Sequence, residues 1–157
     1  MSIPVTIYTD GACRGNPGPG GWGVLIILNN DEITLFGGEK ITTNNRMEMT
    51  AAIEGLSYFE ESTCIEIYTD SNYLKDGIES WIHSWKKNGW KTASKQPVKK
   101  KELWIRVDEL NQCHDVSWRW VKGHSGKREN DIADMRANKG IDEIKMIKKI
   151  KLETETT

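Results

Sequence analysis

The sequence predicts an α/β fold: a five-stranded mixed sheet, made of an antiparallel meander and parallel strands, flanked by helices. Three observations lead to this fold class. The 157 residues contain five short runs rich in apolar and β-branched residues, which favour strands. The first three runs are separated only by turns, as in a meander. After residue 42, strand patterns alternate with helical patterns, which implies parallel strands joined by helical crossovers.

The meander occupies the first part of the chain. Strands are predicted at residues 5–9, 23–28 and 34–36. The segment GNPGPGGWG between the first two is predicted as a turn, because proline and glycine alternate within it. A helix is predicted over residues 43–59, whose apolar residues recur at helical spacing: Met49, Ile53, Leu56 and Phe59.

The remaining elements alternate along the chain. Two more strands are predicted at residues 65–69 and 116–121, and helices at residues 72–79, 81–87, 101–113 and 127–138. We interpret residues 1–142 as one domain, which suits the length of the chain. Residues 143–157 form a basic and then polar tail, expected to be partly disordered because its KLETETT end has little to bury. Alternatively, the tail extends the last helix.

Composition excludes several classes of protein. The net charge is −1, so the chain as a whole is not a basic nucleic-acid binder. The three cysteines (Cys13, Cys64 and Cys113) are odd in number and widely spaced, which argues against a disulfide framework or a zinc site and for a reducing cytosol. No apolar run approaches the length of a membrane span, and the N-terminus does not resemble a signal peptide. A cytoplasmic location without membrane contact is therefore expected.

The tetrapeptide IYTD occurs twice, at residues 7–10 and 67–70, and each copy ends an apolar run. Each aspartate could simply start a turn. If the two strands are parallel neighbours, however, Asp10 and Asp70 stand about 4.8 Å apart, one strand spacing. Two carboxylates that close repel each other unless a proton or a cation lies between them. Because ligands of α/β sheets gather at the carboxyl ends of strands, the pair predicts a divalent-metal site.

A third acid, Glu48, lies on a largely apolar face of the helix predicted at residues 43–59. A carboxylate that points toward a core needs a partner, which a metal site would supply. The spacing equally supports a capping box, in which Asn45 caps the helix and Glu48 follows three residues later. The sequence alone leaves both interpretations of Glu48 open.

Three glycines, Gly18, Gly20 and Gly23, formally match the G-x-G-x-x-G pattern of dinucleotide-binding proteins. That pattern requires a helix to follow, because the phosphate binds at the helix N-terminus. The residues that follow, WGVLIIL, have a strand pattern instead. A dinucleotide site is therefore rejected.

The stretch WVKGHSGKREND carries His124 in a loop between two glycines, and Asp134 follows in the last predicted helix. A single loop histidine is usually only a surface residue, and a single helix acid is usually solvated. The flanking glycines nevertheless suggest a mobile side chain that could transfer protons. Together with the three other acids, both residues become candidates for the same site.

Five segments together closely resemble bacterial ribonuclease H of type 1. They are YTDGACRGNPGPGGWG, TTNNRMEMTAAIEGL, YTDSNYLKDGI, WKKNGWKT and WVKGHSGKREND, and they span about residues 4–140 in the family's order. The resemblance implies a ribonuclease H-like fold and a monomeric, metal-dependent endonuclease that cuts the RNA strand of RNA–DNA hybrids. It places the metal-binding carboxylates at Asp10, Glu48, Asp70 and Asp134, and a mobile catalytic histidine at His124.

The reaction that the resemblance implies is phosphodiester hydrolysis, which needs an activated water and stabilisation of the departing 3′ oxygen. Two Mg²⁺ ions about 4 Å apart can supply both, and Mg²⁺ or Mn²⁺ prefers oxygen ligands. Asp10 is expected to bridge the two ions when substrate is bound. Glu48 and Asp70 would hold the first ion and Asp134 the second. His124 would assist proton transfer or product release, and the products would carry 5′-phosphate and 3′-hydroxyl ends.

Substrate recognition has a separate signal between residues 81 and 101. This segment contains seven lysines and no acid, with tryptophans interleaved. Part of it is a solvated charged surface over a small tryptophan core, but such a patch also neutralises phosphates without reading bases. The resemblance implies a basic protrusion that grips the hybrid, with phosphate contacts at Lys86 and Lys87 and a DNA-side groove shaped by Trp81 and Trp85.

The resemblance also carries over contacts to the hybrid backbone, where amides and backbone groups can bond to 2′-hydroxyls. These positions are Asn16, Thr43, Asn44, Asn45 and Asn72. Cys13 falls at a contact position too, although a small buried cysteine explains it equally well. Four positions depart from the family pattern: Asn72 replaces a frequent glutamine, Ile41 a phosphate-binding arginine, Asp131 the usual glutamate, and Arg136 an apolar residue of the last helix.

Two other classes of function remain open. One is a module that binds hybrids or duplexes without cutting them, although binding alone has no use for clustered acids beside phosphates. The other is a DNA-cutting nuclease or transferase of the same fold, such as a transposase or integrase core, which is expected in a longer chain with separate DNA-binding domains. A cleavage assay with hybrid, RNA duplex and DNA duplex separates the three.

Overall fold

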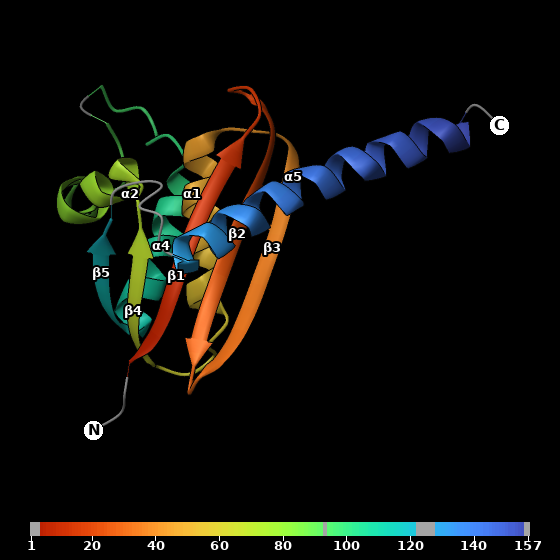
Figure 1. Cartoon of the computed structure of the whole chain (residues 1–157). Coiled ribbons are helices and arrows are strands. Elements are labelled where there is room, and N and C mark those ends of the chain that lie inside the picture. The colour runs from red at the N-terminus through yellow and green to blue at the C-terminus, as the bar shows by residue number, and fades with distance from the viewer. Residues whose placement is uncertain (1–3, 93, 122–127, 156–157) are drawn as a thin grey trace.

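Five strands form one mixed sheet, and helices cover both of its faces (Figure 1). The computed structural model describes residues 4–92, 94–121 and 128–155, with side chains as far as residue 144. The strands are β1 (Val5–Cys13), β2 (Gly18–Leu28), β3 (Asp31–Thr42), β4 (Cys64–Thr69) and β5 (Asp115–Trp120). Their order across the sheet is β3-β2-β1-β4-β5.

The pairing directions confirm the predicted fold class. β2 is antiparallel to both β1 and β3, whereas β4 is parallel to both β1 and β5. The antiparallel strands follow one another directly in the chain, and each parallel pair is joined through helices.

The helices are α1 (Asn44–Ser57), α2 (Asn72–Asp76), the π-helix η1 (Gly77–Trp81), α3 (Ile82–Lys87), α4 (Lys101–Cys113) and α5 (Arg128–Glu155). α2, η1 and α3 follow one another without interruption, whereas the sequence predicts separate helices at residues 72–79 and 81–87. Residues 78–87 contain no proline or glycine that would end a helix. Within the described residues, no helix combines the length and the hydropathy that crossing a bilayer requires.

α5 is 28 residues long and projects past β3, beyond the edge of the sheet (Figure 1). The sequence predicts a helix over residues 127–138 and a partly disordered tail, but the helix continues to Glu155, as in the alternative interpretation. The residues after position 140 include no glycine or proline, and many are good helix formers. The polar composition of the tail is therefore compatible with a helix.

The meander strands are longer than predicted. β2 begins at Gly18, inside the segment predicted as a turn, and β3 extends over residues 31–42 rather than 34–36. Glycines weaken a strand in isolation, but here they make room for α5. A Cβ atom added at Gly21 would lie 2.1 Å from the carbonyl oxygen of Ala137 on α5. Helix packing therefore explains glycines that sequence propensity assigns to a turn.

The sheet separates the core into two layers. The layer under α1 and α4 includes Ile7, Val24, Ile67, Leu56 and Trp104, all fully buried. The layer under α5 is smaller and includes Tyr8, Leu25 and Ala133. The two layers hold a helix against each face of β1, the strand that carries Asp10.

Arg136 is the position of α5 where the resembling family has an apolar residue. Its guanidinium carbon lies 6.0 Å from the ring centre of Phe36 on β3, and Lys139 Nζ lies 4.9 Å from the same centre. Each cation–π contact of this kind contributes about 0.5–1 kcal/mol at exposed sites. The arginine therefore packs onto the sheet through an aromatic ring, and α5 keeps its contact with β3.

Candidate active site

The IYTD copies at residues 7–10 and 67–70 lie side by side. β1 and β4 pair in parallel, and each residue of the first copy faces its counterpart as far as the tyrosines. The rings of Tyr8 and Tyr68 stack with their centres 4.6 Å apart. Continuing this register places Asp10 beside Asp70, just past the end of β4. The repeated sequence thus reflects two neighbouring parallel strands.

Glu48 reaches the same point from α1. The cap of this helix is Thr43, whose hydroxyl accepts a hydrogen bond from the Arg46 N–H at 3.3 Å. Asn45 is therefore not the cap, and the capping-box interpretation of Glu48 is wrong. Glu48 is 5% exposed, and a Cβ atom added at Gly11 would lie 2.4 Å from its backbone nitrogen. Glycine at position 11 lets α1 lie close against β1, which brings Glu48 to the end of β4.

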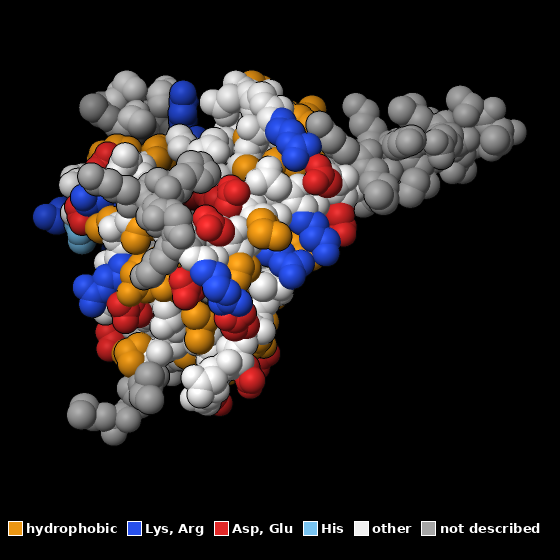
Figure 2. Space-filling model, in the orientation of Figure 1, with side chains coloured by type: hydrophobic (Ala, Val, Ile, Leu, Met, Phe, Trp, Pro, Cys, Tyr) orange, Lys and Arg blue, Asp and Glu red, His pale blue; other side chains and the backbone are white. Residues whose placement is uncertain are grey.

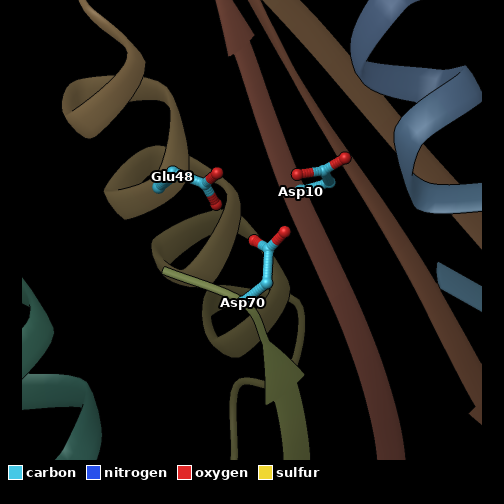
Figure 3. Close-up of side chains that lie close together, drawn as sticks. All are labelled: Asp10, Glu48 and Asp70. Carbon is cyan, nitrogen blue, oxygen red and sulfur yellow. The ribbon is translucent and has the colours of Figure 1, made fainter. Parts of the chain in front are cut away.

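The side chains of Asp10, Glu48 and Asp70 point toward one another (Figure 3). One carboxylate oxygen from each lies within 4.8 Å of the other two. Among the described residues, the buried Oε2 atom of Glu48 finds no hydrogen-bond partner. Burying a carboxylate oxygen without a donor is costly, so the arrangement is suited to a positively charged ligand.

The electrostatics of this cluster support the same conclusion. The pKa of Asp10 is raised from 3.8 to about 8, mainly by burial, then by a hydrogen bond with Asp134 and by the charges of Asp70 and Asp134. The Gly11 N–H, which donates to Asp10 Oδ1 at 2.9 Å, opposes this rise. Burial, followed by the charges of Asp10 and Asp70, also raises the pKa of Glu48 well above its ordinary value. Without a cation, the folded cluster therefore retains protons near neutral pH.

The three carboxylates fit a divalent metal ion. Their donor atoms are all oxygens, which hard cations prefer, and no thiolate or imidazole of the described residues joins them. A cation would give Glu48 Oε2 a partner and would replace the retained protons. Figure 2 shows acidic side chains grouped at the surface beside α5, and Asp10 and Asp70 are only half-buried, so an ion can reach them from solvent.

α5 brings a fourth acid to the cluster. The carboxyl group of Asp134 shares a hydrogen bond with that of Asp10. Asp134 is half-buried, and its backbone carbonyl accepts a hydrogen bond from Asn138 Nδ2 at 3.0 Å. The fourth predicted acid therefore adjoins the cluster at Asp10. His124 lies outside the described residues, and its place in the site stays a prediction.

The predicted backbone contacts lie around the turn between β1 and β2 and the start of α1. Asn16 Oδ1 accepts a hydrogen bond from the Asn44 N–H at 3.4 Å, which ties the turn to the helix. The thiol of Cys13 donates to the carbonyl oxygens of Gly15 at 2.7 Å and Thr42 at 3.4 Å, so this cysteine holds the turn. These contacts form a small polar surface beside the acids.

Asn45 and Asn72, the other predicted backbone contacts, flank the acids on two helices. Asn45 is half-buried in the first turn of α1. Asn72 is exposed and begins α2, two residues after Asp70. Ile41, which replaces an arginine of the resembling family, is 78% exposed and supplies no charge at the end of β3.

Trp81 and Trp85 belong to an aromatic cluster at the base of the basic segment. Their ring centres are 5.9 Å apart, and both rings contact the buried Trp104. A pocket of about 310 Å³ opens between them, lined by Tyr73, Trp81, Trp85, Thr92, Val98 and Lys99. Tyr73 was not predicted from the sequence, because a single tyrosine in a helix pattern has no distinguishing signal.

The two lysines predicted to contact phosphate differ in their surroundings. Lys87 is exposed at the end of α3. Lys86 Nζ lies 3.4 Å from the carboxylate of Asp108 on α4, which also accepts a hydrogen bond from Gln112 at 2.9 Å. Asp108 is 22 residues from Lys86 in the chain, so sequence spacing gave no indication of this ion pair. Lys86 is partly neutralised before any phosphate arrives.

The fold and the site define a class of protein: an α/β protein whose mixed sheet presents a carboxylate site for a divalent metal ion at the end of neighbouring parallel strands. Comparison with known proteins identifies the family. A sequence model of the family described as RNase H matches residues 3–142. The chain belongs to the RNase H family, which depends on divalent metal ions.

Individual relatives agree with this assignment. Ribonuclease H of Neisseria meningitidis serogroup C is 59% identical over 140 residues, which cover 89% of this chain and 97% of that protein. Ribonuclease H of Parvibaculum lavamentivorans is 61% identical over 137 residues, which cover 87% of this chain and 91% of that protein. Among solved structures, LC9-RNase H1 matches this chain with a TM-score of 0.76 and 33% sequence identity. It is described as a type 1 RNase H with the type 2 active-site motif, and the match covers 90% of this chain and 75% of that chain.

Proposed function

We propose that this protein is a metal-dependent endoribonuclease that hydrolyses the RNA strand of RNA–DNA hybrids. The observation that carries the proposal is the meeting of Asp10, Glu48 and Asp70 within 4.8 Å on the fold of the RNase H family. Relatives named ribonuclease H that are about 60% identical over nearly their whole length support the same activity.

The residues of the cluster have distinct proposed roles. When hybrid is bound, two Mg²⁺ ions, replaceable by Mn²⁺, would activate a water and stabilise the departing 3′ oxygen. Asp10 belongs to the cluster with Glu48 and Asp70 and also meets Asp134, which suits it to contact both ions. Glu48 and Asp70 would hold the first ion and Asp134 the second. His124 transfers a proton or assists product release, and the products carry 5′-phosphate and 3′-hydroxyl ends.

The proposed hybrid surface has two parts. The polar surface around Asn16, Thr43 and Asn44 lies beside the acids and offers amide and hydroxyl groups to the RNA backbone, with Cys13 holding the turn. The basic protrusion at residues 81–101 offers lysines to DNA phosphates. The aromatic walls of its pocket, which include Trp81 and Trp85, suit the apolar faces of sugars and bases. The two parts therefore bind the two strands.

We also propose that residues 1–142 form one catalytic domain and that the protein acts in the cytoplasm as a monomer. The match of the family model to residues 3–142 supports this boundary. The remaining residues, 143–157, lie outside the matched range, and those up to Glu155 continue α5.

Labelled substrates test the proposed activity directly. The protein is incubated with RNA–DNA hybrid, RNA duplex and DNA duplex, each with Mg²⁺ or with a chelator. Cleavage of RNA only in the hybrid, and only with metal, is expected. Uncut substrates throughout would favour a binding module, and nicked DNA would favour a DNA-cutting nuclease or transferase.

Replacing Lys86 and Lys87 with alanine together is expected to weaken hybrid binding and to reduce the slope of log affinity against log salt by about 1 to 2. Each phosphate contact contributes about 0.7–0.9 to that slope. Lys86 is expected to contribute less than Lys87, because Lys86 already forms an ion pair with Asp108. Binding is measured in chelator over a range of salt concentrations. The matched control removes two exposed lysines outside the protrusion, Lys40 and Lys139. Equal slopes in all three proteins would mean that these lysines of the protrusion do not contact the substrate.

A further inference from the structure

α5 rests directly on the sheet backbone at Gly23. A Cβ atom added there would lie 2.2 Å from the carbonyl oxygen of Ala133 and 2.6 Å from the backbone nitrogen of Ala137. It would also lie 2.8 Å from the Cβ atom of Arg136. Two of these three neighbours are backbone atoms of the helix, which cannot rotate out of the way. Any side chain at position 23 therefore has to push α5 away from the sheet.

Gly23 also lies beside one member of the acid cluster. In the pairing of β1 with β2, Gly23 is the partner of Asp10. The residue after Ala133, whose carbonyl oxygen touches Gly23, is Asp134, and its carboxyl group shares a hydrogen bond with Asp10. The height of α5 above Gly23 therefore sets the separation of these two carboxyl groups.

Other glycines of the sheet let the rest of α5 pack closely, but they contact the helix farther from Asp134. An added Cβ atom at Gly38 on β3 would lie 2.6 Å from the carbonyl oxygen of Gly140 and 2.8 Å from Ile144. Gly140 follows Asp134 by six residues, which is about 9 Å along a helix. A substitution at Gly38 thus strains the same helix–sheet contact away from the acids, and it provides a control for position 23.

We propose that Gly23 is a positioning residue, which acts on hybrid cleavage by fixing the distance between Asp134 and Asp10. Gly23 bears no ligand atom, and it influences metal binding only through the height of α5. The inference rests on the role proposed above for Asp134 at the second ion. Because misplacement by about 1 Å can cost about 100-fold in rate, one added methyl group is expected to have a large effect.

A double-mutant cycle tests this inference. The proteins are Gly23→Ala, Gly38→Ala, Asp134→Asn and the combinations of each glycine variant with Asp134→Asn. Three quantities are measured: the rate of hybrid cleavage, the melting temperature in chelator, and the rise of the melting temperature when Mn²⁺ is added without substrate. Metal that binds the folded state raises the melting temperature, so the third quantity reports on the site independently of catalysis.

Gly23→Ala is expected to slow cleavage about 10- to 100-fold and to reduce the Mn²⁺-induced rise in melting temperature. In the Asp134→Asn background the same change should alter both quantities little, because the residue through which it acts is already disabled. Gly38→Ala should lower the melting temperature in chelator but leave cleavage and the Mn²⁺ effect nearly unchanged. If Gly23→Ala does not fold, Ala133→Ser, which adds one atom where α5 packs against Tyr8 and Leu25 one residue before Asp134, carries the same expectations.

Three outcomes would overturn the inference. The first is that Gly23→Ala slows cleavage by the same factor in the parent protein and in the Asp134→Asn background. The second is an equal loss of cleavage from Gly38→Ala, which would make the effect one of general helix packing. The third is full cleavage by Asp134→Asn, which overturns the proposed role of Asp134 as well. In the first two outcomes Asp134→Asn itself remains defective, so the failure of the inference is distinguishable from failure of the proposed function.

Discussion

Replacing Asp10 with asparagine is expected to lower the rate of hybrid cleavage by at least about 1,000-fold, since several kcal/mol of metal-dependent stabilisation are lost. Asp10 belongs to the cluster with Glu48 and Asp70 and also meets Asp134, so among the described residues it is the acid that joins all parts of the site. Asparagine keeps the shape of the side chain but removes its charge. Cleavage is measured under single-turnover conditions at saturating protein, which separates the chemical step from binding.

Hybrid binding should survive the same change. The protrusion that supplies the lysines is untouched, and removing a negative charge near phosphates reduces repulsion. Binding is measured in chelator, so that no substrate is consumed. The control is Asp131→Asn, an exposed acid on α5 three residues before Asp134, which should cleave at the parent rate. Retained turnover in Asp10→Asn would contradict the metal role of the cluster.

The sequence could predict Asp10 and Asp70 as a pair because their positions follow from strand periodicity, whereas Asp134, on a helix, was assigned to the site through the family resemblance. Two identical tetrapeptides imply similar strands, and parallel pairing of those strands brings Asp10 and Asp70 together whatever the rest of the fold does. The role of Glu48 was ambiguous, because an acid three residues after a polar residue at the start of a helix fits a capping box as well as a metal site. The structure resolves the ambiguity through Thr43, the residue that caps α1.

Features that depend on packing could not be read from the sequence. Glycine and proline in GPGG have low strand propensity, and only packing explains why β2 begins there: Gly18 lies close to Arg14, Gly20 to Thr42 and Gly21 to Ala137 on α5. The ion pair between Lys86 and Asp108 joins two helices whose relative placement no local pattern specifies. The helical tail was missed because its polar composition fits both a disordered segment and a helix that extends past the sheet.

The metal-free protein is expected to lose stability as pH rises from about 4 to about 8. In the unfolded chain Asp10 releases its proton near its ordinary pKa of 3.8, whereas in the folded protein its pKa is about 8. Between these values the folded state holds more protons than the unfolded state, so the free energy of unfolding decreases with rising pH. One group contributes at most about 1.4 kcal/mol per pH unit. Glu48, whose pKa is also raised, contributes in the same direction.

Asp10→Asn should remove part of this slope and should be more stable than the parent at pH 8 in chelator, because it eliminates a buried charge that repels its neighbours. Denaturant unfolding at several pH values, with and without Mg²⁺, measures both effects. Asp131→Asn, on the exposed side of α5, serves as the control and should keep the parent slope. Mg²⁺ should stabilise the parent most at high pH, where it replaces the lost protons, and should stabilise Asp10→Asn much less. A parent slope of the opposite sign in chelator would mean that these carboxylates do not repel one another in the folded protein, and the electrostatic reason for a metal at this site would be lost.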